Sequence, residues 1–366
     1  MLSLIASSLQ DHSFSNDFLS ESISNNHWEL VGKRIDGSFL SVYQARPKNR
    51  NINASYAFKT LQKKWQGTEL GERILRNEIC LGQSVFCPHI LPVLDYRQSR
   101  IQYWKSEAIV PQEINENSIL LNCSNEMNNI QQNNSDCFDN IAYWPGYFIT
   151  PWLEGQTIQE QLTQKKRIDQ RTVWKIARQT VKALDALNRQ GWSHNDLKPG
   201  NIFVSPTGHV TLIDFGFASK NNDPFNKDYC FQSNNPIACN VNDKTFSGTP
   251  FYLAPEQLLE SAPPDITSDF YSLGIIIFEM LTGKSHFNVF SWNDLYRKYE
   301  TMKCCIENDL NRLCVSPQAI QLLQQLTARK KERRPQTTNE ILTALNKLEM
   351  QTFPRSPNQE ELRQCA

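Results

Sequence analysis

Two short motifs that lie close together constrain this chain more than any other part of its sequence. The first, HNDLKPGN, occupies residues 194–201, and the second, DFG, occupies residues 214–216. The apolar run at residues 210–213 predicts a buried strand that ends where the second motif begins. Such a strand would present the acidic residue of the second motif from a rigid support.

The residue types in these motifs suit the transfer of a phosphoryl group, which depends on positioning and on charge neutralisation. Asp196 provides a carboxylate that can meet an acceptor hydroxyl. Asn201 and Asp214 provide hard oxygen ligands of the kind that Mg²⁺ prefers. Lys198 lies two residues beyond Asp196, so we expect it on the same side of an extended loop and within reach of the transferring phosphate.

Motifs of this length also occur by chance, so a third one matters. The fixed residues of His-x-Asp-x-x-x-x-Asn arise by accident in about a few per cent of chains of this length. The triplet APE at residues 254–256 follows the other two in order, which lowers the joint odds to roughly one in ten thousand. With these motifs the chain resembles the protein kinase family, from about Trp28 to about Leu348.

The resemblance implies an α+β fold, the two-lobed protein kinase fold. A small antiparallel β-sheet lobe with one helix is expected at residues 27–150, and a larger, mainly helical lobe at residues 151–349. The kinase domain would thus cover residues 27–349. The other expected segments are a flexible leader at 1–26, a polar insertion at about 99–144, an extended activation segment at 214–256 and a C-terminal tail at 350–366.

The same resemblance assigns residues to an ATP site. Lys59, in the sequence YAFK, resembles the lysine that contacts the phosphates, and Glu78 resembles its partner on a helix, although Glu69 and Glu72 lie on the same stretch. Thr150 resembles the gatekeeper beside the adenine, which would need the carbonyl of Pro151 and the N–H of Leu153. The implied nucleotide-binding residues are Gly37, Val42, Ala57, Lys59, Glu78, Thr150, Leu153 and Phe203.

Other residues are expected to support the site or to bind the acceptor. By resemblance, Asp269 would hold the backbone of the 194–201 loop, and Arg334 would form a buried, bidentate ion pair with Glu256. Residues 248–253, GTPFYL, resemble the peptide-binding platform of serine/threonine kinases. Apolar positions at helical spacing predict a helix that leads into the loop and buries one face: Val173, Ile176, Ala177, Val181, Leu184 and Leu187.

The chain departs from the family pattern at two places. Only Gly37 remains of the three glycines expected over the phosphates, so the loop at residues 35–42 could equally be an ordinary hairpin turn. Asn195 replaces the arginine that usually precedes the catalytic aspartate and receives an activation-loop phosphate. Because asparagine cannot make that charged contact, we predict that activity needs no phosphate at Thr245 or Ser247.

Composition favours a cytoplasmic enzyme. Lysine plus arginine and aspartate plus glutamate both total 38, so no net charge draws the chain to nucleic acid or to an anionic membrane. Its apolar runs are too short to span a bilayer, and its first residues lack the basic region of a signal peptide. The ten cysteines never form a Cys-x-x-Cys pair, which favours reduced thiols, and Cys80 is expected to be buried. No oligomeric state follows from these patterns.

Three functions stay open at this stage. The first is a serine/threonine protein kinase that uses ATP and Mg²⁺ and acts on a protein hydroxyl. The second is a pseudokinase scaffold with weakened nucleotide binding, suggested by the loop around Gly37. The third is a small-molecule phosphotransferase, which also uses the pattern His-x-Asp-x-x-x-x-Asn; Thr249 and the triplet at 254–256 argue against it, because that family lacks this platform.

Overall fold

The chain folds into two compact units. The computed structural model describes residues 28–48, 55–103, 141–144, 146–165, 167–220, 250–259, 264–284, 297 and 306–352. Of these, the small unit contains the residues up to Cys80 and from Val93 to Trp152, and the large unit contains Leu81–Pro92 and the residues from Leu153 onward. The expected leader at 1–26 lies outside the described residues, as does nearly all of the tail at 350–366.

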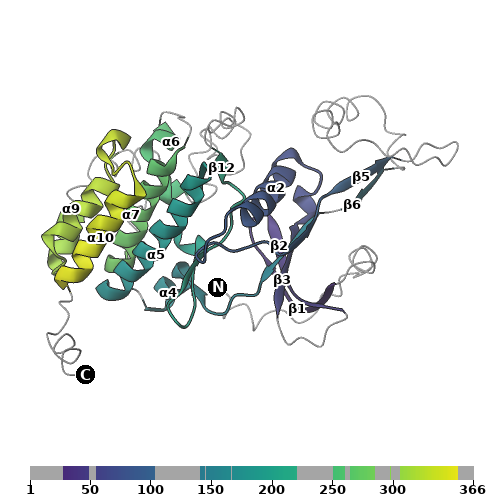
Figure 1. Cartoon of the computed structure of the whole chain (residues 1–366), viewed down its shortest axis with the longest axis horizontal. Coiled ribbons are helices and arrows are strands. Elements are labelled where there is room, and N and C mark those ends of the chain that lie inside the picture. Colours follow the sequence, from purple (N-terminus) through teal and green to yellow (C-terminus); the bar gives the residue numbers. More distant parts are fainter. Residues whose placement is uncertain are drawn as a thin grey trace, which may run out of the picture. The chain divides into compact units, whose positions relative to one another are not determined.

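The small unit is built on an antiparallel sheet, as predicted, which has five strands in the order β1-β2-β3-β7-β4. Strands β1, β2 and β3 are labelled in Figure 1. The strands are β1 (Trp28–Asp36), β2 (Leu40–Pro47), β3 (Tyr56–Leu61), β4 (Asp95–Arg97) and β7 (Tyr147–Pro151). Two further strands, β5 (Arg100–Tyr103) and β6 (Ile141–Trp144), pair with each other. The described ends of the expected polar insertion are therefore β-structure, and residues 104–140 lie outside the described part.

One α-helix packs against this sheet. Helix α2 (Glu69–Ser84) follows the short 3-10 helix η2 (Lys63–Trp65). Its residues Leu75 and Ile79 form an apolar cluster with Leu61 and Phe148 of the sheet. Cys80 is exposed and has a free thiol, so the expectation of a buried thiol was wrong. It lies four residues from the exposed Arg76, on the stripe of α2 that faces away from the cluster.

The large unit is mainly helical. Helices α5 (Gln170–Arg189), α7 (Ile266–Thr282), α9 (Pro317–Leu326) and α10 (Thr338–Thr352) lie side by side (Figure 1). In α7 every residue from Ile266 to Leu281 is buried, and Gly274 allows α9 to approach, since a Cβ there would lie 2.7 Å from Thr327 Cγ2. The predicted buried face of α5 is confirmed at Val173, Ile176, Ala177, Val181, Leu184 and Leu187.

Short strands and helices connect the large helices. Strands β8 (Gln156–Thr157), β10 (Ile202–Val204) and β11 (Val210–Leu212) form a three-stranded sheet, and β9 (Trp192–Ser193) pairs with β12 (Ser219–Lys220). The buried strand predicted before the DFG motif is therefore confirmed as β11. The remaining helices are α4 (Ile158–Lys165), α6 (Pro255–Leu259), η4 (Pro199–Asn201), η6 (Pro250–Tyr252) and η7 (Lys331–Arg333).

The segment Leu81–Pro92 belongs to the large unit, although the sequence placed residues 27–150 together in the small lobe. Its backbone pairs with the end of β11: the Leu91 N–H donates to the Leu212 carbonyl at 3.1 Å, and the Leu212 N–H donates to the His89 carbonyl at 2.8 Å. Ile90 and Leu91 also join the apolar core of the large unit. These contacts, which link residues far apart in the sequence, place the boundary within α2.

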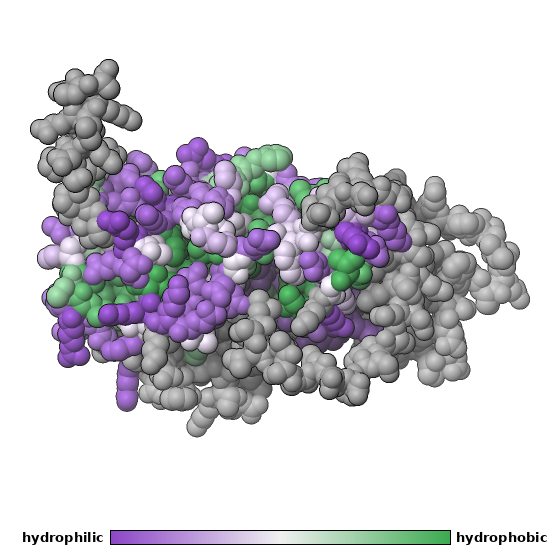
Figure 2. All heavy atoms as spheres, turned by 90° about the horizontal axis from the view of Figure 1, so that it is seen from below, coloured by the Kyte–Doolittle hydropathy of each residue, from purple (hydrophilic) through white to green (hydrophobic). Residues whose placement is uncertain are grey.

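Hydrophilic residues cover much of the described surface on the face shown in Figure 2, and hydrophobic residues show there in smaller patches. Among the helices of the described residues, none combines the length and the apolar composition that a bilayer crossing requires.

A buried ion pair joins α6 to the segment before α10, as the sequence predicted. Arg334 donates through Nη1 to Glu256 Oε1 and through Nη2 to Glu256 Oε2, both at 2.7 Å. The side chains are 0% and 5% exposed, and Arg334 also donates to the Ala328 and Thr267 carbonyls. Because removal of one partner leaves a charge in the core, the pair should tolerate single substitutions poorly.

We therefore expect Arg334→Met to lower the free energy of unfolding by about 3–5 kcal/mol. Urea denaturation followed by circular dichroism measures this change. The double variant Glu256→Gln/Arg334→Met should recover at least about 1 kcal/mol of the loss, because no charge is then stranded. A loss below about 1 kcal/mol in the single variant would show that the pair does not stabilise the large unit.

Candidate active site

Three polar side chains predicted from the first motif meet in the loop between β9 and β10. Lys198 Nζ lies 2.6 Å from Asp196 Oδ2. Asn201 Nδ2 donates to the backbone carbonyl of Asp196 at 2.8 Å and to its Oδ2 at 3.1 Å. These contacts hold the Asp196 carboxylate in one position, and its side chain stays 22% exposed, accessible to a reacting group.

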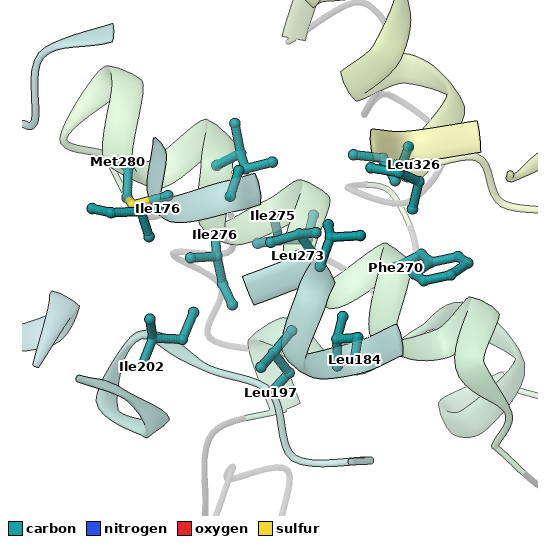
Figure 3. Packing of buried hydrophobic residues seen from close by; sticks show 14 of the residues in the cluster. Ile176, Leu184, Leu197, Ile202, Phe270, Leu273, Ile275, Ile276, Met280 and Leu326 are labelled. Atoms are coloured by element: carbon teal, nitrogen blue, oxygen red, sulfur yellow. The ribbon is translucent and has the colours of Figure 1, made fainter. Parts of the chain in front are cut away.

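The loop holds this arrangement because apolar residues alternate with the polar ones. Leu197 and Ile202 are 1% and 0% exposed, and both belong to the apolar core with Leu184 and Ile276 (Figure 3). The Asn201 N–H donates to the Lys198 carbonyl at 2.9 Å, and the Asn201 carbonyl accepts from the Ile213 N–H at 3.0 Å. The loop is therefore tied both to the core and to the residue before Asp214.

Asp269, on the first turn of α7, supports the loop from the core, as the resemblance implied. Its carboxylate accepts from the backbone N–H of His194 at 2.7 Å and from that of Asn195 at 2.8 Å. Burial raises the pKa of Asp269 to about 7, and the two N–H donors oppose that rise because they favour the charged form. Asp269 thus joins the first turn of α7 to the backbone of the loop through two hydrogen bonds.

Asp214 lies two residues after β11 and has a φ of 67°, in the left-handed region that few non-glycine residues adopt. Burial raises the pKa of Asp196, and the negative charge of Asp214 adds to that rise, whereas Lys198 opposes it. The carboxylates of Asp196 and Asp214 lie close enough to interact. The Asn201 amide turns its nitrogen to Asp196, and its oxygen is the atom that could bind a cation. Such a set of oxygen ligands fits Mg²⁺. A cation here would offset the repulsion between the carboxylates.

His194 and Phe215 pack in the core of the large unit. His194 is 0% exposed and Phe215 is 1% exposed, and their ring centroids lie 5.4 Å apart. Burial lowers the pKa of His194 to about 4, so the imidazole is neutral at pH 7. Neither ring therefore supplies a charge to the site.

Asn195 makes a contact that the sequence analysis missed. Its Nδ2 donates to the Phe217 carbonyl at 3.1 Å and to Ser219 Oγ at 2.7 Å, and its φ is 65°. Asparagine tolerates this left-handed conformation better than most residues and carries two amide donors, so its identity was the available signal. The side chain thereby ties the loop to the residues that follow the DFG motif.

In the small unit, four of the predicted nucleotide residues share one face of the sheet. Val42 pairs with Lys59, and Ala57 pairs with Thr150, in a register that places all four on the same side. Lys59 Nζ lies 5.5 Å from the centroid of the Phe148 ring.

The burial pattern of α2 agrees with the choice of Glu78, rather than Glu69 or Glu72, as the predicted partner of Lys59. It is 3% exposed, on the side of α2 that packs on the sheet, whereas Glu69 is exposed and Glu72 is only partly buried. The ion pair between Lys59 and Glu78 stays a prediction.

Gly37 begins the turn between β1 and β2, where its N–H donates to the Leu40 carbonyl at 2.8 Å. The other two predicted nucleotide residues, Leu153 and Phe203, lie in the large unit and are partly buried. Gly155 lies between Leu153 and β8 with a φ of 138°, and a Cβ there would lie 2.2 Å from the Val204 carbonyl oxygen. Glycine is therefore required for this segment to lie against β10, the strand that carries Phe203.

Several predicted residues fall outside the described part of the chain. Thr245, Ser247 and Thr249 lie within residues 221–249, whose structure is not described. The third motif, by contrast, lies within the described residues. There the Ala254 N–H donates to Gln257 Oε1 at 2.9 Å.

Comparison with known proteins points to one family. Residues 102–345 match the sequence model of the protein kinase domain. The match includes the three motifs and the loop around Asp196, and it begins after Lys59 and Glu78.

Curated relatives carry the same indication. Serine/threonine-protein kinase ULK3 of Xenopus laevis is 28% identical over 307 residues, which is 83% of this chain and 52% of that protein. Serine/threonine-protein kinase sck2 of Schizosaccharomyces pombe is 33% identical over 152 residues, 41% of this chain and 21% of that protein. The probable serine/threonine-protein kinase PknB of Bifidobacterium longum is 33% identical over 141 residues, 38% and 19% of the two chains. The chain thus spans about half or less of the length of these relatives.

The two bonds accepted by Asp269 generate a stability prediction. Asp269→Asn keeps one acceptor oxygen but places an amide N–H₂ against the second backbone N–H, so the free energy of unfolding should fall by about 1–3 kcal/mol. Urea denaturation measures the loss, and hydrogen exchange should quicken at the amides of His194 and Asn195.

Asp309→Asn is the matched control, because Asp309 contacts Lys284 and Arg312 only at 3.6 Å and 4.0 Å. That variant should stay within about 1 kcal/mol of the wild type. Equal losses in the two variants would show that Asp269 has no special role in holding the loop.

Proposed function

Since this chain belongs to the protein kinase family, of the serine/threonine type, we propose that it transfers the γ-phosphoryl group of ATP to a serine or threonine hydroxyl of a protein. The observation that carries the proposal is the Asp196 carboxylate, held by Lys198 and Asn201 over a loop that Asp269 supports. A chain that only bound partners would not require this set of contacts.

Asp196 has the central role in the proposed reaction. Its carboxylate orients the acceptor hydroxyl and takes its proton as the oxygen attacks. Lys198, 2.6 Å from the carboxylate, steadies the γ-phosphate and offsets part of its charge. Both side chains stay partly exposed, at 22% for Asp196 and 30% for Lys198, so substrate can reach them.

Asn201 and Asp214 would hold Mg²⁺, which supplies neutralisation of the phosphate charge when it is bound. Lys59, paired with Glu78, would neutralise the α- and β-phosphates of ATP. The adenine would lie against Val42, Ala57, Thr150, Leu153 and Phe203 and bond to the carbonyl of Pro151 and the N–H of Leu153, with Gly37 at the phosphates. The shared sheet face of Val42, Ala57, Lys59 and Thr150 supports this assignment.

The acceptor is proposed to be a protein rather than a small alcohol. The sequence GTPFYLAPE at residues 248–256 resembles the peptide platform of serine/threonine kinases, and Glu256 is held in the core by Arg334. We assign the kinase domain to residues 27–349, of which residues 102–345 match the family. A cytoplasmic location and the lack of a nucleic-acid partner stay predictions from composition.

The proposed activity does not depend on activation-loop phosphorylation. In place of the arginine that would bind a phosphate, Asn195 makes neutral hydrogen bonds to the Phe217 carbonyl and Ser219 Oγ. Ser219 belongs to β12, which pairs with β9 just before the loop. The residues after the DFG motif are therefore held without a charged group.

Phosphotransfer is tested by incubating the purified chain with labelled Mg-ATP and a generic protein acceptor. Label should appear on serine or threonine. Asp196→Asn should lower kcat by about 10²- to 10⁴-fold, because the proton acceptor is lost, while Mg-ATP binding measured by calorimetry stays nearly unchanged. Asp309→Asn, which removes a carboxylate elsewhere in the large unit, serves as control and should keep wild-type turnover.

Three other results would each reject the proposal. Binding of Mg-ATP without transfer would indicate a pseudokinase, and transfer only to a small alcohol would indicate a small-molecule phosphotransferase. Full turnover of Asp196→Asn would remove the role assigned to this residue.

Phosphate independence is tested with the double variant Thr245→Ala/Ser247→Ala. Its kcat should stay within about threefold of the wild type, because no cationic partner for a phosphate precedes Asp196. Asn195→Gly is the contrasting variant: glycine retains the left-handed backbone but removes the amide donors, so kcat should fall at least about fivefold. A near-complete loss of turnover in the double alanine variant would contradict the prediction.

A further inference from the structure

The tip of the β1–β2 hairpin, residues 37–40, is bonded to the segment that follows β3. Three consecutive carbonyls of the tip accept hydrogen bonds from that segment. Gln62 Nε2 donates to the Gly37 carbonyl at 2.6 Å, and Trp65 Nε1 donates to the Ser38 carbonyl at 3.0 Å. The Gln62 backbone N–H donates to the Phe39 carbonyl at 2.8 Å. The side chains of Gln62 and Trp65 together form a tip clamp.

Ring packing reinforces the tip clamp. The ring of Phe39 lies 4.8 Å from that of Trp65, centroid to centroid, and Phe39 is 9% exposed. Trp65 itself is fixed to the start of α2, since its carbonyl accepts from Thr68 Oγ1 at 2.8 Å. A Cβ on Gly71 would lie 2.1 Å from the Trp65 carbonyl oxygen, so only glycine lets the first turn of α2 lie so close. The clamp is therefore part of a rigid connection to α2.

The tip clamp also determines where the tip directs its N–H groups. In a planar trans peptide, the carbonyl of one residue and the N–H of the next point in opposite directions. Because the carbonyls of Gly37 and Ser38 point to the clamp, the N–H groups of Ser38 and Phe39 point away from it. Successive N–H groups that face one way form a surface that binds anions such as phosphate.

We propose that Gln62 and Trp65 are positioning residues for the nucleotide phosphates. Their side chains hold the backbone of the tip in a conformation that binds these phosphates, although the tip contains only one glycine. A glycine-rich loop reaches such a conformation through its backbone freedom, at an entropic cost on ordering. Here the side chains of the clamp impose the conformation before the nucleotide binds. The inference rests on the proposed function, because it concerns the ATP of that reaction.

The test compares Gln62→Met and Trp65→Phe with the wild type. Each variant removes one donor and keeps most of the side-chain volume, and Trp65→Phe retains an aromatic ring beside Phe39. Gln66→Met is the matched control, because Gln66 Nε2 also donates to a backbone carbonyl, that of Leu61 at 2.9 Å, but not to the tip.

Three experiments are done on each protein: calorimetry gives the Kd of Mg-ATP, kinetics with a protein acceptor give KM and kcat, and hydrogen exchange is followed in peptides that contain the Gly37 amide. In both clamp variants Kd and KM for ATP should rise about threefold to tenfold, the effect of one lost hydrogen bond. The kcat at saturating ATP should stay within about twofold of the wild type, because the lost contacts stabilise bound ATP equally in the ground state and in the transition state. Exchange at Gly37, whose N–H bonds to the Leu40 carbonyl, should quicken.

Specific outcomes overturn the inference. Unchanged Kd and KM in both clamp variants would do so, and so would an equal rise in Gln66→Met, which would indicate a general effect on the small unit. If the wild type does not bind Mg-ATP, the proposed function and the phosphate-positioning role both fail. Hydrogen exchange then tests separately whether the clamp side chains hold the tip. Unchanged exchange at Gly37 in both clamp variants would show that they do not.

Discussion

The candidate site depends on the two hydrogen bonds that the buried Asp269 carboxylate accepts from the loop before Asp196. They connect a short, irregular segment to α7, a helix in which every residue from Ile266 to Leu281 is buried. Leu197 and Ile202 fix the same segment through the apolar core. With its backbone held at both places, the loop can present Asp196, Lys198 and Asn201 in one arrangement, which is what phosphoryl transfer asks of a protein.

Two departures from the family pattern share one physical explanation. Where an arginine would hold a phosphate, Asn195 bonds directly to the residues after the DFG motif. Where glycines would supply backbone freedom, Gln62 and Trp65 bond directly to the hairpin tip. In each place, neutral hydrogen bonds, most of them to backbone carbonyls, replace a feature that would depend on modification or on flexibility. In the proposed kinase, these contacts would hold parts of the site in place before any phosphate or nucleotide arrives.

The division of the chain into units shows where sequence reasoning was limited. The helix α5 followed from periodicity, because the pattern of apolar residues repeats with the geometry of the element. The antiparallel sheet was implied by the family resemblance. Residues 81–92, which the sequence grouped with the small lobe, lie with the large unit, since their pairing with β11 joins segments more than a hundred residues apart. The exposure of Cys80 was also missed, because it depends on which side of α2 meets the sheet.

The sequence by itself determined the family, and it placed a carboxylate, a lysine and two candidate oxygen ligands at the spacing from which the chemistry is predicted. It could do so because the groups lie within one short stretch, where chain geometry limits their separation. Only the tertiary structure decided what holds them. The partners of Asn195, Gln62 and Trp65 are mostly backbone carbonyls, which carry no residue identity and leave no signal in the sequence.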